Sequence, residues 1–346
     1  MGRINEMRMP TWATLGLNYL DDQEFDIKNQ AYFKQSHGKE IEEVAKALGA
    51  YKLGLSEKIN KENKDYRNFS LAYEVSGKEE LKKIDLNLKE DYKTLVSNID
   101  IKANKDSKSS FIISIFDDNK DSFINSRIRL LLEEGSYLKL TLVTNLSEGS
   151  VNLNSLASLI KENATLDLTY IEVGASKSLV NIDNILKEEG ARLILDGAYF
   201  KEGDDFLDLY VTNEHYGNNT DSSAYFNGAL KDRAEKNFKG VVDLRRGCHK
   251  ADGKIGDYSM MLSDQVINKS APVLLNEEKE VAGNHAASVG RLNKDMLFYI
   301  MSRGFSKKQA YAMMLEANFA PAVDKIEDDD LRAKIKAKVH QMNSRD

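Results

Sequence analysis

Residues 138–142 read Leu-Lys-Leu-Thr-Leu, and residues 166–170 read Leu-Asp-Leu-Thr-Tyr. Apolar and polar residues alternate in both stretches, and this period of two is typical of a β-strand with one buried face. The same alternation occurs from Ile84 to Leu88 and from Phe111 to Ile115. We therefore expect a chain built mainly of short strands from about residue 80 onward.

The strand-like stretches recur at a regular interval. Their first apolar residues are about 27 positions apart, a spacing typical of repeat proteins whose coils stack on one another. After the fifth, the spacing shortens to about 16 residues, with Gly, Asn and Asp between the segments. The pattern favours a β-solenoid whose ends need helical caps. The first series is Ile84, Phe111, Leu138, Leu166 and Leu193, and the second continues near Leu209, Phe226, Val242, Met261 and Leu274.

Two apolar stretches do not alternate. Residues 123–132 and 153–160 are apolar over most of their length and are interpreted as helices. Strands that alternate with helices are typical of an α/β sheet, so such a sheet over residues 110–200 remains an alternative to the solenoid.

The chain divides into three expected regions: an N-terminal helical and irregular region (1–78), a coil core (79–284) and a C-terminal helical domain (285–346). In the first, a helix is expected over 39–48, and Trp12 is expected to be a packing anchor. In the last, Asn293 is expected to cap one helix, Ser306 with Gln309 forms a capping box for a second, and a third begins near Asp328.

The composition is that of an ordinary soluble protein. Forty-nine Lys and Arg against 55 Asp and Glu give a net charge of -6, and the two signs are interleaved, which disfavours a nucleic-acid-binding face. No run of about 18 apolar residues is present, so we expect no membrane span and a cytoplasmic protein. The common catalytic motifs are also missing, which favours a non-enzymatic platform.

Few residues could bind a metal. The single cysteine, Cys248, is adjacent to His249 and is interpreted as a passive thiol. His37, His215 and His340 fit surface or hydrogen-bonded structural roles. His285 differs because it lies in Gly-Asn-His-Ala-Ala-Ser-Val-Gly, where small neighbours allow an ion or another backbone to come close.

Several C-terminal stretches resemble the SufB/SufD family of iron-sulfur cluster assembly scaffolds. They are Phe238-Lys-Gly-Val-Val, Ala251-Asp-Gly-Lys, Met260-Met-Leu-Ser, Ala271-Pro-Val-Leu, His285-Ala-Ala-Ser-Val-Gly-Arg-Leu and Leu297-Phe-Tyr-Ile-Met-Ser-Arg-Gly-Phe. The resemblance is dense over the C-terminal part of the chain and one of order and spacing upstream. It implies a right-handed parallel β-helix, which favours the solenoid over the α/β alternative.

The resemblance also implies a site and two partners. His285 falls on the histidine that the family places between a SufB-like and a SufD-like subunit, where a transient cluster would form. The SufB-like subunit carries a cysteine where this chain has Asp257, and a glutamate where it has Ala286. These departures and the short chain indicate the SufD branch. They leave His285 as the main ligand candidate and Asp257 as a weak one, a solvated turn carboxylate being the favoured interpretation of Asp257.

The remaining expectations follow from the same family. The C-terminal helices would dock a SufC-like ATPase, and the isolated chain would bind no cofactor firmly and could pair with itself. The alternatives from other classes are a β-solenoid enzyme acting on polysaccharide and a transport subunit associated with an ABC-type ATPase. The residues expected to contact the ATPase are Met296, Phe298, Tyr299, Arg303, Met313, Met314 and Phe319.

Overall fold

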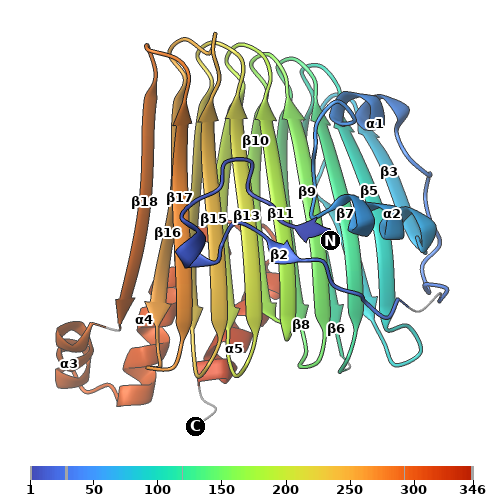
Figure 1. Cartoon of the computed structure of the whole chain (residues 1–346). Helices are drawn as coiled ribbons and strands as arrows, with labels where there is room; N and C mark the ends of the chain where they lie inside the picture. The colour runs from blue at the N-terminus through green and yellow to red at the C-terminus, as the bar shows by residue number, and fades with distance from the viewer. Residues whose placement is uncertain (1, 28–29, 119, 292, 344–346) are drawn as a thin grey trace.

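The computed structural model describes residues 2–27, 30–118, 120–291 and 293–343. In these residues, two parallel eight-stranded sheets face each other and the chain alternates between them, so each coil contributes one strand to each sheet (Figure 1). The odd sheet contains β3 (Phe69–Val75), β5 (Thr94–Ala103), β7 (Phe123–Leu132), β9 (Val151–Ile160), β11 (Lys177–Leu186), β13 (Phe206–His215), β15 (Glu235–Leu244) and β17 (Ile267–Asn276). The even sheet contains β4 (Lys82–Leu88), β6 (Lys108–Asp117), β8 (Tyr137–Leu146), β10 (Thr165–Gly174), β12 (Arg192–Lys201), β14 (Asp221–Leu230), β16 (Asp252–Met261) and β18 (Ala282–Arg291).

The expected parallel solenoid is confirmed. Leu166 lies directly between Leu138 and Leu193 in the register of the even sheet, so these three leucines are one position repeated in successive coils. Phe111 pairs with Leu140 and Ile84 with Ile113, so the first two residues of the series lie on the same face but at other register positions. The 16-residue series has a different meaning. Leu209 lies on β13 and Phe226 on β14, so that interval is half a coil and the coils do not shorten.

The two stretches expected to be helices are strands, and the α/β alternative is wrong. Residues 123–132 form β7, and residues 153–160 lie in β9. Both strands are buried on the inner face by the coil interior and on the outer face by the N-terminal region. A strand covered on both sides lacks the apolar and polar alternation, so its period does not distinguish it from a helix.

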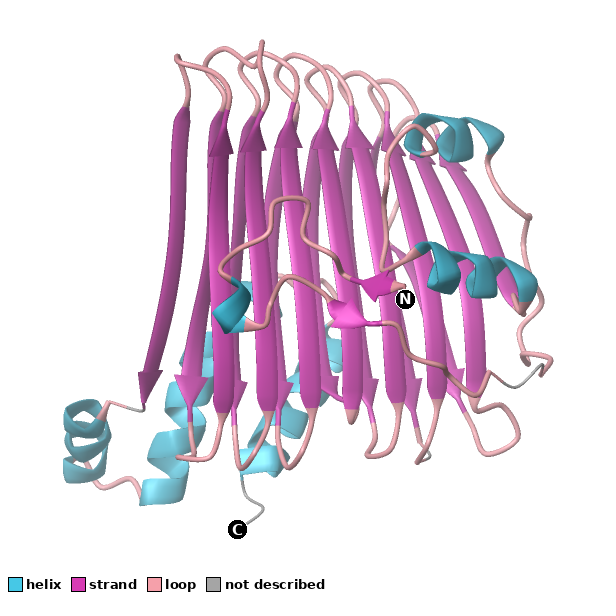
Figure 2. Cartoon of the chain, viewed as in Figure 1, coloured by secondary structure: helices cyan, strands magenta, loops and turns pink. Residues whose placement is uncertain are grey.

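The N-terminal region covers the outer face of the odd sheet (Figure 2). It contains β1 (Arg3–Ile4), the short 3-10 helix η1 (Ala13–Leu15), β2 (Leu20–Asp21), α1 (Glu42–Leu48) and α2 (Glu57–Asp65). The helix expected over 39–48 is present in shorter form as α1. Trp12 is 82% exposed, so the expectation that it anchors the core is wrong.

The C-terminal helices have the expected caps. The Asn293 side chain accepts hydrogen bonds at the start of α3 (Lys294–Ser302), and Ser306 and Gln309 form a capping box at the start of α4 (Lys307–Val323). α4 and α5 (Asp329–Asn343) pack on the outer face of the even sheet, whereas α3 has no buried residue. The strands of the coil stack run from Phe69 to Arg291, beyond the expected range of 79–284 at both ends.

The coil interior is one continuous apolar cluster of leucine, isoleucine, valine and aromatic side chains. None of the described helices is both long and apolar enough to cross a membrane.

His215 is a polar exception at the edge of this interior. Its ring is fully buried, and its two nitrogens lie 2.8 Å from the hydroxyl oxygens of Thr220 and Ser222. Burial lowers the pKa of His215 from 6.5 to about 4. The expected structural role of this histidine agrees with these contacts.

The low pKa of His215 predicts a loss of stability in acid. Because the folded-state pKa lies below the unfolded value, the unfolded chain binds the proton more readily, and stability is lost as pH falls from about 6.5 through about 4. His215→Gln should remove up to about 3 kcal/mol of this pH dependence. Urea unfolding at a series of pH values measures it, with exposed His249→Gln as the control. Identical pH profiles for the wild type and His215→Gln would contradict the assignment.

Candidate functional site at the open end of the coil stack

The coil stack ends at β17 and β18. Each of these strands pairs on one side only with a described strand, and most of β18 is exposed. The other edge of β18 therefore presents unpaired backbone N–H and C=O groups, which can pair with another chain. Its sequence Ala-Gly-Asn-His-Ala-Ala-Ser-Val-Gly-Arg consists mostly of small residues that would permit close approach.

His285 lies on the inner side of β18, at the mouth of the coil interior. A Cβ atom built on Gly283, two residues earlier and on the same face, would come within 2.8 Å of Leu274 on β17. The ring of His285 is exposed and reaches toward β17, where its Nδ1 lies 3.0 Å from the carbonyl oxygen of Pro272. The apolar residue Ile255 of the preceding coil lies next to His285 in the sheet register.

The contact with Pro272 determines which nitrogen of His285 can bind a ligand. A carbonyl oxygen only accepts hydrogen bonds, so Nδ1 must carry the proton and donate it. In the neutral ring the free lone pair is then on Nε2, and no described residue forms a hydrogen bond with this nitrogen. A backbone carbonyl that orients a histidine in this way is a common feature of metal-binding sites.

Asp257 is not the solvated turn carboxylate expected from the sequence. It lies within β16 and is fully buried, with its side chain inside the coil. Lys236 forms an ion pair with one carboxylate oxygen, and the Tyr199 hydroxyl donates a 2.8 Å hydrogen bond to the other. Because both oxygens are committed to these contacts, Asp257 is a poor ligand for an additional ion.

Tyr199 reaches Asp257 because of a glycine between them. Tyr199 lies on β12, and Gly228 of β14 is its neighbour in the register. A Cβ atom at position 228 would come within 1.9 Å of the tyrosine ring. The missing side chain lets the Tyr199 hydroxyl extend across the level of β14 to Asp257 on β16. Burial raises the pKa of Tyr199 and lowers that of Lys236.

A second buried polar group lies deeper in the stack. Glu172 on β10 accepts hydrogen bonds from Tyr170 at 2.8 Å and Ser178 at 2.5 Å, and it lies 3.1 Å from the ammonium of Lys201. All four side chains are buried. Sequence reasoning missed these lysines, although Lys236 shares the period-two face of Phe238, which indicated an inward position.

Two polar side chains near the mouth lack partners among the described residues. They are Asn268, which neighbours Lys236 in the register, and Ser270, which neighbours Phe238. Both extend from β17 toward the inner side. Buried polar groups are normally hydrogen-bonded, so these atoms indicate an additional partner such as water or a second chain.

The described residues do not form a complete metal site. No three His, Cys, Asp or Glu side chains gather in the described ranges in a way that could hold an ion, so His285 is a single candidate ligand. Cys248 is buried in the turn after β15, and burial raises the pKa of its thiol to about 11. A thiol with this pKa is protonated and unreactive at neutral pH, as expected for a passive thiol.

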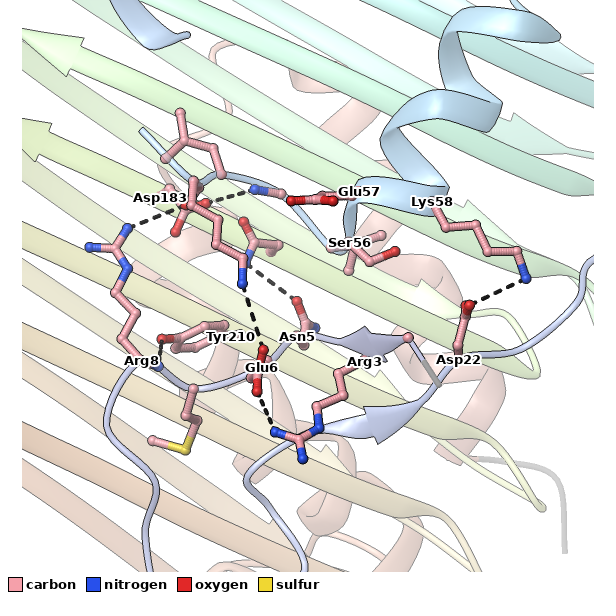
Figure 3. A pocket seen from close by; sticks show the side chains of 17 residues that line it. Arg3, Asn5, Glu6, Arg8, Asp22, Ser56, Glu57, Lys58, Asp183 and Tyr210 are labelled. Atoms are coloured by element: carbon pink, nitrogen blue, oxygen red, sulfur yellow. Dashed lines mark hydrogen bonds and ion pairs between the residues drawn. The ribbon is translucent and has the colours of Figure 1, made fainter. Parts of the chain in front are cut away.

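A cavity outside this end of the stack lies under the N-terminal segment. It has a volume of about 780 Å³ and separates the N-terminal segment from the outer face of the odd sheet (Figure 3). Four basic and four acidic side chains line it, and among them Arg3 pairs with Glu6 and Lys58 with Asp22. This balance leaves no net charge that would select a particular ligand.

The residues expected to dock a partner ATPase separate into exposed and buried ones. Phe298 of α3 is 73% exposed, and Arg303 lies with its guanidinium 5.1 Å from the ring of Tyr299. Phe319 is 3% exposed and packs edge-on against Phe200 of β12, so the chain's own sheet covers this ring. Met296, Tyr299 and Met313 are also exposed, and Met314 is half-buried.

Comparison with known proteins identifies relatives with this core. Residues 86–318 match the family model described as SUF system FeS cluster assembly, SufBD core domain. The chain is 29% identical over 155 residues to the iron-sulfur cluster assembly protein SufD of Bacillus subtilis, covering 43% of this chain and 36% of that protein. It is 24% identical over 204 residues to the SufB protein of the same organism, covering 58% and 43%, and 22% identical over 183 residues to SufD of Escherichia coli, covering 53% and 43%. The chain therefore matches less than half the length of each of these relatives.

The buried pair of Lys236 and Asp257 predicts a non-additive response to mutation. Lys236→Met leaves the Asp257 carboxylate unpaired in the coil interior and should cost about 3–5 kcal/mol of stability. Adding Asp257→Leu removes the stranded charge and should recover most of that loss. Chemical denaturation of the single and double variants measures both effects. Arg233→Met, at the exposed pair with Asp204, is the control and should cost less than about 1 kcal/mol. Additive losses at Lys236 and Asp257 would contradict the coupling.

Proposed function

Because the chain belongs to the SufBD core family of the SUF system for FeS cluster assembly, we propose that it is a SufD-like scaffold subunit that assembles clusters with a SufB-like partner in the cytoplasm. On this proposal the chain catalyses no reaction itself. The observation that carries the proposal is the exposed His285 at the open end of the coil stack, with its Nε2 available.

The end of the coil stack supports pairing with a second scaffold subunit. The unpaired edge of β18 offers main-chain hydrogen bonds, and its small side chains allow another strand to approach. Ile267 and Val289 at the same end are 47% and 45% exposed and would be covered by such a partner. Asn268 and Ser270 would gain hydrogen bonds from the partner or from water trapped between the chains.

His285 would contribute one ligand to a cluster that the two subunits share. Imidazole replaces cysteine on one iron in known types of iron-sulfur cluster, so a histidine ligand is chemically reasonable. The thiolates would come from the partner, because this chain has one cysteine and its thiol is buried. Asp257 is held by Lys236 and Tyr199 and would act within the coil as a structural group.

The exposed aromatic face of α3 supports docking of a SufC-like ATPase. Phe298 and Tyr299 have no covering element in the described chain, and exposed aromatic and arginine side chains often dominate the binding energy of protein interfaces. α4, which follows α3, is packed on the even sheet. Movement of a bound ATPase dimer would therefore be transmitted through α4 to the coil stack.

A polysaccharide-active enzyme is the less favoured alternative. Such an enzyme needs a pair of carboxylates beside an open substrate groove. Three strand carboxylates, Glu172, Asp208 and Asp257, are fully buried and each forms an ion pair with a lysine. These acids are therefore not available to a polymer on the surface.

Replacing His285 should impair cluster formation without unfolding the chain. With a SufB-like and a SufC-like partner present, His285→Ala should lower the yield of reconstituted cluster on the order of tenfold, because a direct ligand is lost. Anaerobic reconstitution followed by absorption spectroscopy measures the yield, and co-purification shows whether the complex remains. His249→Ala, at an exposed histidine in a turn, is the matched control and should behave as the wild type. An unchanged yield with His285→Ala would remove its role as a ligand.

Replacing Phe298 should weaken binding of the ATPase. Phe298→Asp places a charge in the centre of the proposed apolar contact and should weaken binding by roughly 30-fold or more. Titration of a SufC-like protein measured by calorimetry tests this directly. Trp12→Asp is the control, because it changes a similarly exposed aromatic residue in the N-terminal region, outside the proposed contact. Equal affinities for both variants and the wild type would place the ATPase elsewhere.

A further inference from the structure

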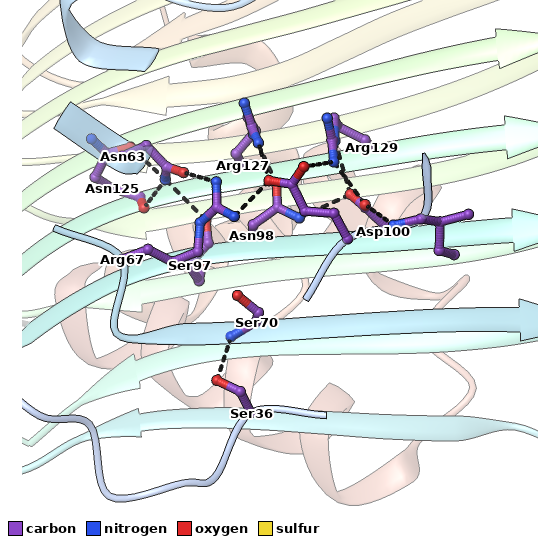
Figure 4. Close-up of polar contacts among 12 residues, drawn as sticks. Ser36, Asn63, Arg67, Ser70, Ser97, Asn98, Asp100, Asn125, Arg127 and Arg129 are labelled. Atoms are coloured by element: carbon purple, nitrogen blue, oxygen red, sulfur yellow. Dashed lines mark hydrogen bonds and ion pairs between the residues drawn. The ribbon is translucent and has the colours of Figure 1, made fainter. Parts of the chain in front are cut away.

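Three arginines gather on the outer face of the odd sheet, away from the mouth of the coils. Arg127 and Arg129 are two residues apart on β7, so their side chains leave the same face of the strand. Arg67 comes from the segment after α2 and joins them (Figure 4). The side chains of Arg127 and Arg129 are 22% and 11% exposed.

Among the described residues, two carboxylates form ion pairs with these three guanidinium groups. Arg129 donates two hydrogen bonds to Asp100, at 2.8 Å and 2.7 Å. Glu40 accepts from Arg67 at 2.6 Å and from Arg127 at 3.1 Å. The sum over these five groups is one positive charge, in a region that is largely shielded from water.

Burial and the neighbouring positive charges act together on the pKa of Arg127. Burial and the charges of Arg129 and Arg67 lower the pKa of Arg127 to about 10. Glu40 and Asp100 act in the opposite direction but do not compensate for this effect. An anion beside Arg127 would relieve the repulsion among the three arginines.

Donors remain unused in this cluster. Arg127 uses Nε for Asn98 and Nη2 for Glu40, and Arg129 uses Nε and Nη2 for Asp100. The Nη1 group of each has no hydrogen-bond partner among the described residues. The Nε of Arg67 is buried and has no partner among the described residues.

A cavity of about 210 Å³ lies against the two β7 arginines. It exists because the neighbouring strand is small at this level: Ser155 pairs with Arg127 in the register, and Ala157 pairs with Arg129. The opposite wall includes Gly54 and Asn60 from the N-terminal region. The cavity is therefore lined by two arginines, by Ser155 and Asn60, and otherwise by glycine and apolar residues.

We propose that this cavity binds a tetrahedral oxyanion, a phosphate or sulfate group, between Arg127, Arg129 and Ser155. Planar guanidinium groups form paired hydrogen bonds with such oxygens, and a hydroxyl donates to a third. The bound anion neutralises the excess positive charge and ties β7 to β9 beneath the N-terminal region. The phosphoryl group could belong to free inorganic phosphate or to a small organic phosphate.

Calorimetric titration of the full chain tests the proposal, with total ionic strength held constant by sodium chloride. Inorganic phosphate and sulfate should bind with saturation, and acetate should bind at least about tenfold more weakly because it offers fewer oxygens to the arginines. A parallel titration with AMP distinguishes the sources of the group. Tighter binding of AMP identifies the phosphoryl group of an organic ligand, and binding of phosphate alone identifies the free ion.

Two variants change the site in different ways. Arg127→Met removes one charge and keeps a side chain of similar length. Ser155→Leu fills the cavity and keeps all three arginines. Each substitution should weaken phosphate binding roughly tenfold or more. Arg233→Met, at the exposed pair with Asp204, is the control and should leave binding unchanged. Thermal unfolding of each protein shows whether it is folded. If Arg127→Met loses stability, Ser155→Leu still tests the cavity, because it keeps all the ion pairs of the arginines. Absence of saturable binding to the wild type, or equal affinity in Arg127→Met and Ser155→Leu, would overturn the proposal.

Discussion

Backbone pairing between successive coils is the constraint on which the rest of this structure depends. Each strand inside the stack gains its hydrogen bonds from the coil before it and the coil after it, in parallel register, whereas the strands of the first and last coils pair with one neighbouring strand. The last coil has no successor, so β18 retains an unpaired edge and the inner face of the stack remains open there. The ligand candidate His285 lies on this last strand, and its ring donates a hydrogen bond to the carbonyl oxygen of Pro272 on the other sheet.

The interior of the stack combines apolar coils with a few paired charges. Leucine and isoleucine side chains fill most of the lumen, but Lys236 with Asp257 and Lys201 with Glu172 are fully buried within it. Burying such charges is costly unless each is paired and hydrogen-bonded, and both pairs have tyrosine or serine hydroxyls around them. Their contacts join side chains from several coils, so a change of register would separate the partners.

The two terminal regions cover the outer faces of the two sheets through different kinds of contact. The N-terminal region covers the outer face of the odd sheet, where buried ion pairs and the cluster of Arg67, Arg127 and Arg129 lie. The helices α4 and α5 cover the even sheet through apolar contacts such as Phe319 on Phe200. The exposed strand β18 and the exposed helix α3 are separate elements, so the proposed scaffold contact and the proposed ATPase contact involve different parts of the chain.

The sequence by itself determined the repeat of the strands and the residues at which the C-terminal helices α3 and α4 begin. The alternation around Leu138, Leu166 and Leu193 predicted stacked strands, because an apolar residue that faces the interior must recur once in every coil. The capping residues Asn293 and Ser306 predicted where α3 and α4 begin, because a cap depends on contacts within one helical turn. His285 stood out from its small neighbours and from the family resemblance.

Only the tertiary structure decided what depends on residues far apart in the chain. β7 and β9 read as helices because the N-terminal region covers their outer face, which no local pattern reveals. Asp257 is a paired group in the interior because Lys236 and Tyr199 reach it from other strands, and Phe319 is a core residue because Phe200 lies beneath it. A period in the sequence reports which side of an element a residue faces, whereas burial and pairing depend on which other element lies opposite.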